Sequence, residues 1–327
     1  MIKASSMAKK NIQIGILSFF ILTIIAALIF ILFWEQDHAE FDSDSEFQMV
    51  NSIEYEGKRY WLRDDVETLL IVGVDKFEAS PSPDSYNNDK CADFLVLLVI
   101  DRTMNSYSTV YLNRDTITDV TVLGVGGQKV GSVREQLSLA HTYGTGKEDS
   151  ARNTARAVSA IFGGLRIDRY ITLTMDAVAV LNDSVGGVTL TIPEDMTMVD
   201  PSFAEGATVT LNGDQALRFV RARGSLADSS NAKRMQRQQQ YLDALYAQLM
   251  AHLGSGEAFS TDVLRELSEY MTTNCSSGEL ERMMDALDAL EMAETHSMRG
   301  DYKIGEFAEF YPHESSVKKI LVSLFYK

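Results

Sequence analysis

Short continuous runs of apolar residues alternate along the chain with segments whose apolar residues recur at helical spacing. The runs Thr68–Val74 and Phe94–Ile100 carry no charge and are rich in branched side chains. Such runs are typical of strands that are buried on both faces. Val110–Leu112 ends a third run, and Tyr170–Leu173 and Val188–Ile192 form two more. The pattern therefore predicts a sheet in the interior of the protein.

Segments with helical periodicity lie between and after these runs. Ser150–Phe162 places Ala155 and Val158 on one face, and Asn212-Gly213 opens a helix that carries apolar residues four apart. Further helices are predicted for Ser132–His141, for a segment near Asp176–Asn182, and for Asn231–Leu253. Strands that alternate with helices predict an α/β fold with helices covering both faces of the sheet.

The N-terminal region predicts a membrane anchor. Residues 11–34 contain no charged side chain, and about 20 apolar residues suffice to cross a bilayer as a helix. Lysines precede the run and acidic residues follow it, so the positive-inside rule places residues 1–10 in the cytoplasm and the rest outside. A cleaved signal peptide is the alternative, but it would end in small residues, whereas this run ends Phe-Ile-Leu-Phe-Trp. We therefore predict an uncleaved, single-pass anchor in the cell membrane.

Changes of composition divide the remaining chain. Residues 35–60 begin with an acidic stretch and are interpreted as an extracellular stalk. Residues 61–254 carry the alternating strands and helices, and a Gly-Ser-Gly linker follows at residue 254. Residues 255–327 are predicted to form a C-terminal helical extension.

Charge and cysteine content exclude some classes of function. The chain has 327 residues, 45% of them hydrophobic, and a net charge of -16. An acidic protein lacks the basic face that nucleic acids require, so we expect no nucleic-acid partner. The two cysteines, Cys91 and Cys275, fit no zinc spacing and are expected to be free thiols.

Candidate chemistry lies at the ends of the predicted strands. Asp75 directly follows one strand, Asp93 directly precedes the next, and Arg114-Asp115 comes after a third. Ligands of open α/β folds gather at strand ends, and carboxylate oxygens suit Mg²⁺. Ordinary turn chemistry and a surface ion pair remain the alternatives for these residues.

A second set of polar residues lies further along the chain. It consists of Arg221, Arg223, Arg234, Arg237 and Gln238. Arginine presents a planar fork of donors that fits phosphate oxygens two at a time, although a solvated helix surface is the alternative. Motifs of serine hydrolases, zinc proteases and P-loop proteins are absent. His141 either lines the site or is a structural histidine.

Taken in order, these motifs resemble the LytR-CpsA-Psr family of cell-wall glycopolymer ligases. The resemblance covers about residues 68–250. It includes Leu-Leu-Ile-Val-Gly-Val-Asp75, Arg114-Asp115-Thr116, Leu211-Asn212-Gly213 through Arg221-x-Arg223, and Arg234-x-x-Arg237-Gln238. Asn113 stands where the family often has Pro, Cys91 where it often has Arg, and Asn231 where it usually has Asp.

The resemblance implies an α/β/α sandwich with a central mixed sheet outside the membrane, with residues 61–254 as the catalytic domain. It implies transfer of a glycopolymer from a polyprenyl-pyrophosphate carrier to the MurNAc 6-hydroxyl of peptidoglycan, forming a phosphodiester. Arg114 matches the catalytic arginine, with Asp75 or Asp115 as the base. Asp93 and Asp75 match the metal-binding positions for Mg²⁺ or Mn²⁺. The pyrophosphate clamp corresponds to Arg221, Arg223, Arg234 and Gln238.

Two other functions remain open from the sequence. The same residues could pass the pyrophosphate to water, which would make the protein a polyprenyl-pyrophosphate hydrolase. A non-catalytic regulator or scaffold could use the arginines only to grip wall polymer.

Overall fold

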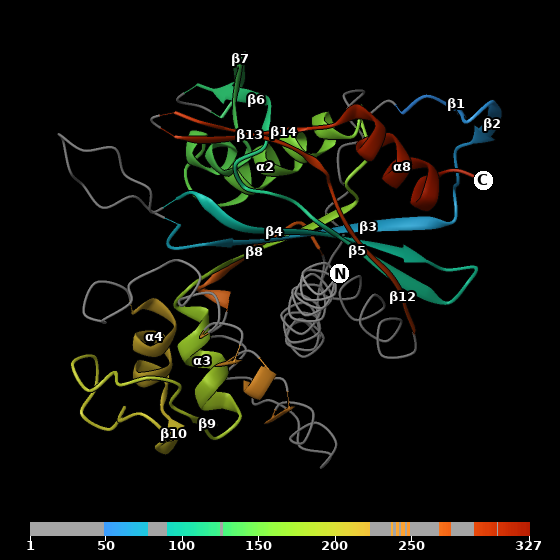
Figure 1. The fold of residues 1–327 in the computed structure, drawn as a ribbon. Coiled ribbons are helices and arrows are strands. Elements are labelled where there is room, and N and C mark those ends of the chain that lie inside the picture. Colours follow the sequence, from blue (N-terminus) through green and yellow to red (C-terminus); the bar gives the residue numbers. More distant parts are fainter. Residues whose placement is uncertain are drawn as a thin grey trace. The chain divides into compact units, whose positions relative to one another are not determined.

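Four of the five apolar runs form the inner strands of a six-stranded mixed sheet in a computed structural model of the protein (Figure 1), whereas Val188–Ile192 contributes to a separate two-stranded hairpin. The structure describes residues 49–77, 90–124, 127–222, 268–275, 291–305 and 307–327, together with 237, 240, 241, 243–245, 247 and 248. The chain divides into two compact units, and it passes from one to the other between Thr174 and Met175 and again between Tyr270 and Met271. The larger contains the described residues within Glu35–Thr174 and Met271–Lys327, and the smaller contains the described residues within Met175–Tyr270.

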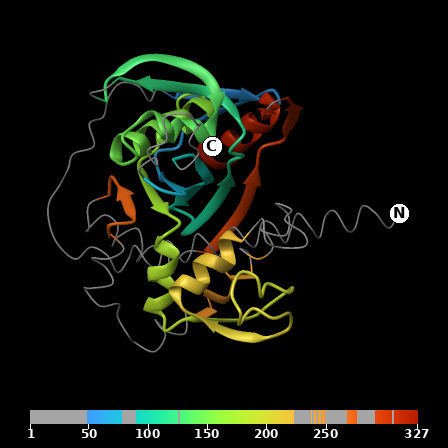
Figure 2. The ribbon, with the colours of Figure 1, turned by 90° about the vertical axis from the view of Figure 1, so that its left-hand side faces the viewer.

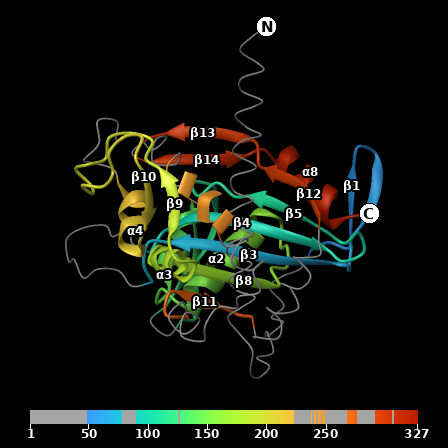
Figure 3. The same cartoon turned by 90° about the horizontal axis from the view of Figure 1, so that it is seen from below.

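The sheet of the larger unit has the strand order β11-β8-β3-β4-β5-β12. Its strands are β3 (Val66–Val74), β4 (Ala92–Asp101), β5 (Ser106–Tyr111), β8 (Arg169–Thr174), β11 (Met271–Thr273) and β12 (Glu291–Ser297). β3, β4 and β5 pair antiparallel, whereas β8 is parallel to β3 and β12 is parallel to β5. Figure 3 shows β8, β3, β4 and β5 side by side. The prediction of an α/β fold with a central mixed sheet is confirmed.

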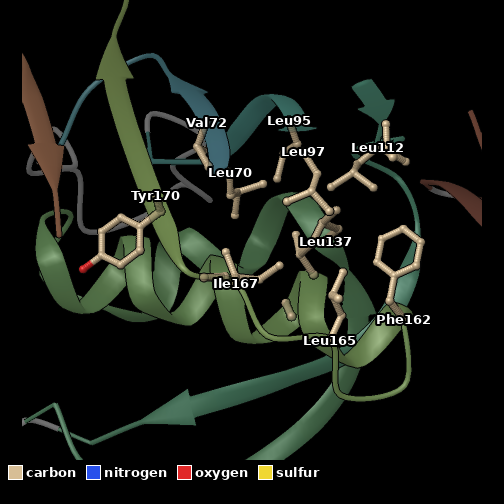
Figure 4. Packing of buried hydrophobic residues seen from close by; sticks show 14 of the residues in the cluster. Leu70, Val72, Leu95, Leu97, Leu112, Leu137, Phe162, Leu165, Ile167 and Tyr170 are labelled. Atoms are coloured by element: carbon tan, nitrogen blue, oxygen red, sulfur yellow. The ribbon is translucent and has the colours of Figure 1, made fainter. Parts of the chain in front are cut away.

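One face of this sheet is covered by two helices from distant parts of the chain. These helices are α2 (Glu148–Ile161) and α8 (Glu314–Phe325), and Figure 2 shows both on the same side of the strands. Leu70, Val72, Leu95 and Leu97 of the sheet point toward Phe162 and its neighbours at the end of α2 (Figure 4). Leu69 and Ile71 point to the opposite face and are equally buried, as the continuous apolar run predicted.

Short hairpins complete the larger unit. They are β1–β2 (Ser52–Tyr55, Lys58–Trp61), β6–β7 (Ile117–Leu123, Lys129–Gln136) and β13–β14 (Gly300–Ile304, Ala308–Pro312), and a 3-10 helix η1 spans Leu137–Tyr143. The predicted helix Ser132–His141 is therefore wrong for Ser132–Gln136, whereas Leu137–His141 lie in the 3-10 helix. Its first half pairs antiparallel with β6, so hydrogen bonds to a neighbouring strand override the weak local periodicity.

The C-terminal region differs from a helical extension. Among its described residues, β11 and β12 form the two edges of the central sheet, and β13 and β14 form a hairpin. Only α8 and Ser268 are helical in this part of the described chain. A strand at a sheet edge satisfies the backbone groups of its neighbour, which the local sequence does not reveal.

The smaller unit packs α3 (Ala177–Ser184) against α4 (Gly213–Arg221), with the hairpin of β9 (Val188–Thr191) and β10 (Thr208–Leu211) beside them (Figure 1). Asn212 caps α4 by accepting from the Gln215 amide, and the Gln215 side chain accepts from the Asn212 amide in return. A Cβ at Gly213 would lie 2.8 Å from the Ala179 carbonyl oxygen, so only glycine allows the two helices to approach this closely.

Several expectations concern residues outside this description. The predicted anchor at residues 11–34 and most of the predicted helix Asn231–Leu253 lie outside the described residues. No helix within the described part of the chain has the length and hydropathy needed to cross a membrane. Cys91 is buried and Cys275 is half-buried, and the two are not joined to each other by a disulfide, as expected.

Candidate active site

The predicted carboxylates lie at one end of the central sheet. Asp75 directly follows β3, and antiparallel pairing places the end of β3 beside the beginning of β4. The register changes there: Gly73 pairs with Phe94 and Val74 pairs with Ala92, so Asp93 is the extra residue of a β-bulge inside β4. A β-bulge redirects the side chain of its extra residue. The Asp93 side chain is accordingly 38% exposed, whereas Ala92 is fully buried.

The turn at Asn113–Thr116 carries Arg114 to the same end of the sheet. β5 runs antiparallel to β4 and pairs Tyr111 with Val96, so the residues after β5 lie beside those before Val96. Backbone hydrogen bonds tie the turn to its surroundings: the Arg114 carbonyl accepts from the Ser138 amide at 2.9 Å, and the Asp115 carbonyl accepts from the Phe310 amide at 2.8 Å. The backbone of Arg114 is therefore held by η1 and β14 together.

The Asn113 side chain also stabilises the turn through hydrogen bonds. The Asn113 Oδ1 accepts from the Asp115 amide at 3.0 Å, which is the arrangement of an Asx turn. The Asn113 Nδ2 donates to the Tyr302 hydroxyl at 2.5 Å. Asparagine at the position where the family often has proline thus stabilises the same turn through hydrogen bonds.

The guanidinium of Arg114 lies between two carboxylates. Its Nη1 donates to Asp93 Oδ1, and its Nε lies 3.7 Å from Asp115 Oδ1. The Nε atom is buried, and it donates no hydrogen bond to any described residue. Arg114 is 35% exposed, so part of its donor fork faces solvent and can meet a ligand.

Asp115 is partly buried beside Arg114. Burial raises the pKa of its carboxyl, and the nearby charge of Arg114 opposes that shift. Gln136 Nε2 lies 3.4 Å from Asp115 Oδ1 and also donates to the Ala308 carbonyl at 2.5 Å. Gln136 was not singled out in the sequence, because only the pairing of β7 with β6 brings it to this turn.

The oxygen donors near Asp75 and Asp93 determine whether a divalent cation can bind there. Among the described residues, no group of three or more His, Cys, Asp and Glu side chains is arranged to hold a metal. Mg²⁺ commonly uses only one or two carboxylates, together with water and substrate phosphates. Asp75 and Asp93 at adjoining strand ends fit that kind of site, and they do not fit a cage built only from protein ligands.

His141 is a structural residue rather than part of this site. It is fully buried, and its Nδ1 lies 3.1 Å from the carbonyl oxygen of Lys90, three residues before Asp93. Burial lowers the pKa of its imidazole to about 4. Lys90 in turn donates from Nζ to the Gly144 carbonyl at 2.7 Å, so the two residues hold the entry to β4.

The second predicted set belongs to the smaller unit. Arg221, the last residue of α4, is 40% exposed and pairs with Asp176 at 3.1 Å. Arg223, Arg234 and Gln238 lie outside the described residues. Arg237, by contrast, is described and is only 2% exposed, with Glu194 at 2.6 Å from its Nη1. Arg237 was one of the arginines of the second predicted set, but no local sequence pattern indicates that it is the buried one.

Relatives of known name share most of this chain. Over 264 residues it is 27% identical to the polyisoprenyl-teichoic acid–peptidoglycan teichoic acid transferase TagU of Bacillus cereus, covering 78% of this chain and 77% of that protein. It is 24% identical over 243 residues to Biofilm regulatory protein A of Streptococcus mutans, covering 72% of this chain but only 56% of that protein's length.

The fold also occurs in solved structures. A protein from Streptococcus agalactiae superposes with a TM-score of 0.55 at 20% sequence identity, covering 80% of this chain and 86% of that one. The profile of the LytR_cpsA_psr family matches residues 32–322, which include both units and all the residues of the two sets. The chain therefore belongs to the LytR-CpsA-Psr family.

Proposed function

We propose that the protein is a membrane-anchored extracellular phosphotransferase. It moves a glycopolymer from a polyprenyl-pyrophosphate carrier to the 6-hydroxyl of MurNAc in peptidoglycan and leaves a phosphodiester. The observation that carries this proposal is the Arg114 guanidinium, held on a hydrogen-bonded turn against Asp93 and Asp115 in a chain of this family. The relative TagU, named as a teichoic acid transferase, supports the class of reaction.

The reaction exchanges the phosphoanhydride bond of the carrier for a phosphate ester bond to the acceptor. The hydroxyl oxygen of the acceptor forms a bond to the polymer-bearing phosphorus, and the bond from that phosphorus to the bridging oxygen breaks. Polyprenyl phosphate leaves with that oxygen. Negative charge grows on the departing group, and positioned donors such as those of Arg114 stabilise it more than they stabilise the ground state.

The proton of the acceptor hydroxyl passes to a carboxylate. A raised pKa brings a carboxyl closer to neutral pH and makes it a better general base. Asp115 has this property through its burial, so we assign it the role of base, with Asp75 as the other candidate. In this assignment Arg114 also opposes protonation of Asp115 before the acceptor arrives.

Asp93 and Asp75 would hold Mg²⁺ or Mn²⁺ together with phosphate oxygens of the carrier. When bound, the cation would neutralise charge on the pyrophosphate. Asp93 would then serve both the cation and Arg114, whose Nη1 donates to Asp93 Oδ1. Arg221, Arg223, Arg234 and Gln238 are assigned to the phosphate oxygens, with no metal needed.

The location of the reaction follows from the anchor expected at residues 11–34. The carrier is a membrane lipid, so an anchored domain meets it at the membrane surface. N-terminal sequencing of the mature protein tests this part: retention of residues 11–34 supports the anchor, and a start after Trp34 shows a cleaved signal peptide.

The experiment on the reaction uses the purified full chain in detergent, a polyprenyl-pyrophosphate-linked glycopolymer, Mg²⁺ and peptidoglycan fragments. We expect polymer joined to MurNAc and release of polyprenyl phosphate. Free polymer phosphate formed equally without peptidoglycan would identify a hydrolase instead. Binding of polymer or lipid without turnover would identify a regulator or scaffold.

A further inference from the structure

The hairpin of β13 and β14 carries an exposed tyrosine beside the turn that holds Arg114 (Figure 1). Tyr302 lies in β13 and is 54% exposed. Its hydroxyl accepts from Asn113 Nδ2 at 2.5 Å, and Asn113 directly precedes Arg114. The proposed chemistry uses the turn and gives this ring no role. A large ring that stays in contact with water beside a candidate site is available to a ligand.

The Tyr302 ring is held in place by its neighbour across the hairpin as well as by its hydroxyl. Its centroid lies 5.1 Å from that of Phe310, at an interplanar angle of 57°, and the two residues are direct strand partners. Phe310 is 5% exposed and belongs to the hydrophobic core of the larger unit. Its amide donates to the Asp115 carbonyl at 2.8 Å. Phe310 therefore anchors both the ring and the turn, which gives the ring a fixed place relative to the turn.

The two faces of the hairpin differ in polarity. Successive residues of a strand point to opposite faces, so Tyr302, Ile304 and Phe310 share one face. Ile304 is 79% exposed, and the apolar face therefore extends past the part that the core covers. The opposite face carries polar and charged side chains, namely Asp301, Lys303, Glu309 and Tyr311. An exposed aromatic ring on the apolar face only, next to the candidate site, indicates contact with a ligand that has an apolar side.

A pyranose ring has the shape and polarity that fit this surface. Its axial C–H bonds form a weakly polar face that stacks on the electron-rich face of an aromatic ring, while its hydroxyl groups stay at the edge. The Tyr302 hydroxyl accepts from Asn113, so its own hydrogen can be donated to a hydroxyl or acetamido oxygen of a sugar. A hydrocarbon tail has no acceptor for that hydrogen. The ring and its donor together favour a sugar over a lipid chain.

The surroundings of the Asp115 carboxylate favour the sugar of the acceptor. Gln136 Nε2 lies 3.4 Å from Asp115 Oδ1 and donates to the Ala308 carbonyl of β14 at 2.5 Å. Ala308 pairs across the hairpin with Ile304, two residues after Tyr302. The carboxylate thus lies on the side of the turn where the hairpin is attached. Since Asp115 is the assigned base, the acceptor hydroxyl has to come within hydrogen-bond distance of this carboxylate.

We propose that Tyr302 is a specificity-determining residue that stacks on a pyranose ring of the acceptor glycan. The ring holds the sugar, and Asp115 accepts the proton of its hydroxyl. This inference rests on the proposed function, because it names a contact of the acceptor in that reaction. The contact stabilises the bound acceptor and the transition state alike, so its loss raises the KM for the acceptor and leaves kcat little changed.

The test compares Tyr302→Leu, Tyr302→Phe and the matched control Tyr311→Leu in the full chain in detergent. Leucine removes the aromatic face, whereas phenylalanine keeps it and removes only the hydroxyl. Tyr311 lies on the opposite face of the same hairpin, where the Lys303 Nζ is 4.2 Å from its ring centroid. The binding probe is a GlcNAc–MurNAc tetrasaccharide, titrated without the lipid carrier. The kcat and the KM values for peptidoglycan fragments and for lipid-linked polymer report the reaction.

For Tyr302→Leu we expect the Kd of the tetrasaccharide and the KM for peptidoglycan fragments to rise about tenfold, because the stacked ring and its hydroxyl are lost together. The kcat and the KM for lipid-linked polymer should change little. Tyr302→Phe should raise the same two quantities by about threefold, since only a hydrogen bond is lost. Tyr311→Leu should leave both unchanged.

Other outcomes overturn the inference. An unchanged Kd in folded Tyr302→Leu, or no tetrasaccharide binding by the wild type, would show that the ring binds no acceptor sugar. Equal falls in kcat for Tyr302→Leu and Tyr302→Phe, with Kd unchanged, would make Tyr302 a support of the Asn113 turn only. A raised KM for lipid-linked polymer alone would place the ring at the donor and overturn its assignment to the acceptor. If the wild type transfers no polymer but binds the tetrasaccharide through Tyr302, the transfer reaction is refuted and the sugar contact stands.

Discussion

The turn that carries Arg114 and the helix end that carries Arg221 hold their arginines in opposite ways. At the turn, backbone hydrogen bonds from η1 and β14 fix the chain, and carboxylates surround the guanidinium. At the helix end, the chain is fixed by the side chain of Arg237, whose Nη2 donates to the carbonyl of Ala222, and the Arg221 guanidinium has one exposed carboxylate partner. A backbone-held position survives side-chain substitution, whereas a side-chain-held position depends on one residue.

The turn is therefore expected to affect the reaction itself, and the surroundings of α4 are expected to affect the position of the arginines. Substitutions at the turn should alter the reaction and leave the fold intact, because the hydrogen bonds that build the turn come mostly from peptide groups. Substitutions around α4 should alter where the arginines lie. The predictions below test this separation.

Arg114→Ala should have the largest effect. Loss of one positioned charged donor costs on the order of 10²–10³ in rate, while the turn keeps its backbone hydrogen bonds. We expect that loss in kcat with an unchanged melting temperature. Arg102→Ala is the control, because Arg102 is an exposed arginine of the same unit whose partner is Glu67. Near-normal turnover of Arg114→Ala would exclude a catalytic role.

A fall in pH should lower the stability of the larger unit because His141 is buried in its neutral form. Its pKa in the folded state is about 4, below the ordinary value of 6.5, because burial disfavours the charged form. The unfolded chain therefore takes up the proton first, and stability is lost as pH falls from about 6.5 toward 4. The shift corresponds to about 3 kcal/mol at most.

Denaturant unfolding at several pH values measures this loss. His141→Gln can still donate to the Lys90 carbonyl but cannot titrate, so its stability should change less between pH 6.5 and 5. The comparison also cancels His296, whose pKa is likewise lowered by burial. Parallel pH curves for the two proteins would contradict the assignment.

Asp93→Asn should weaken the binding of the metal and leave the binding of phosphate unchanged. Removal of one anionic ligand should raise the Mg²⁺ concentration for half-maximal turnover about tenfold. The Kd of inorganic pyrophosphate without metal should stay the same, because the arginines grip phosphate directly. Asp64→Asn, at a 96% exposed side chain of the same unit, is the control. An unchanged Mg²⁺ dependence would make Asp93 a turn residue only.

Asp176→Asn should have the smallest effect and the opposite sign. Exposed ion pairs contribute at most about 1 kcal/mol, so release of Arg221 should tighten pyrophosphate binding by up to about fivefold. Asp176 makes no side-chain cap bond to α3, and stability should therefore change little. Asp214→Asn removes the same charge from the first turn of α4 and should alter the Kd less. Equal effects of the two changes would point to net charge alone.

Several features of the molecule could be predicted from the chain because their causes are local or involve uniform burial. A strand buried on both faces must be apolar throughout, so the central parts of β3 and β4 were visible in the run of residues, whereas Asp93, expected just before the second strand, lies inside β4. The start of α4 was visible because Asn212 and Gln215 satisfy each other's backbone within one turn. The ordered motifs also identified the family.

The tertiary structure decided what depends on distant partners. The bulge at Asp93 comes from the register between β3 and β4, and β7 is a strand because β6 lies beside it. Arg237 and Arg221 look alike in the sequence, yet Arg237 is buried because Glu194, 43 positions away, compensates its charge. The residue type provides the donors of an arginine, but only the fold determines which acceptors they meet and how much water remains around them.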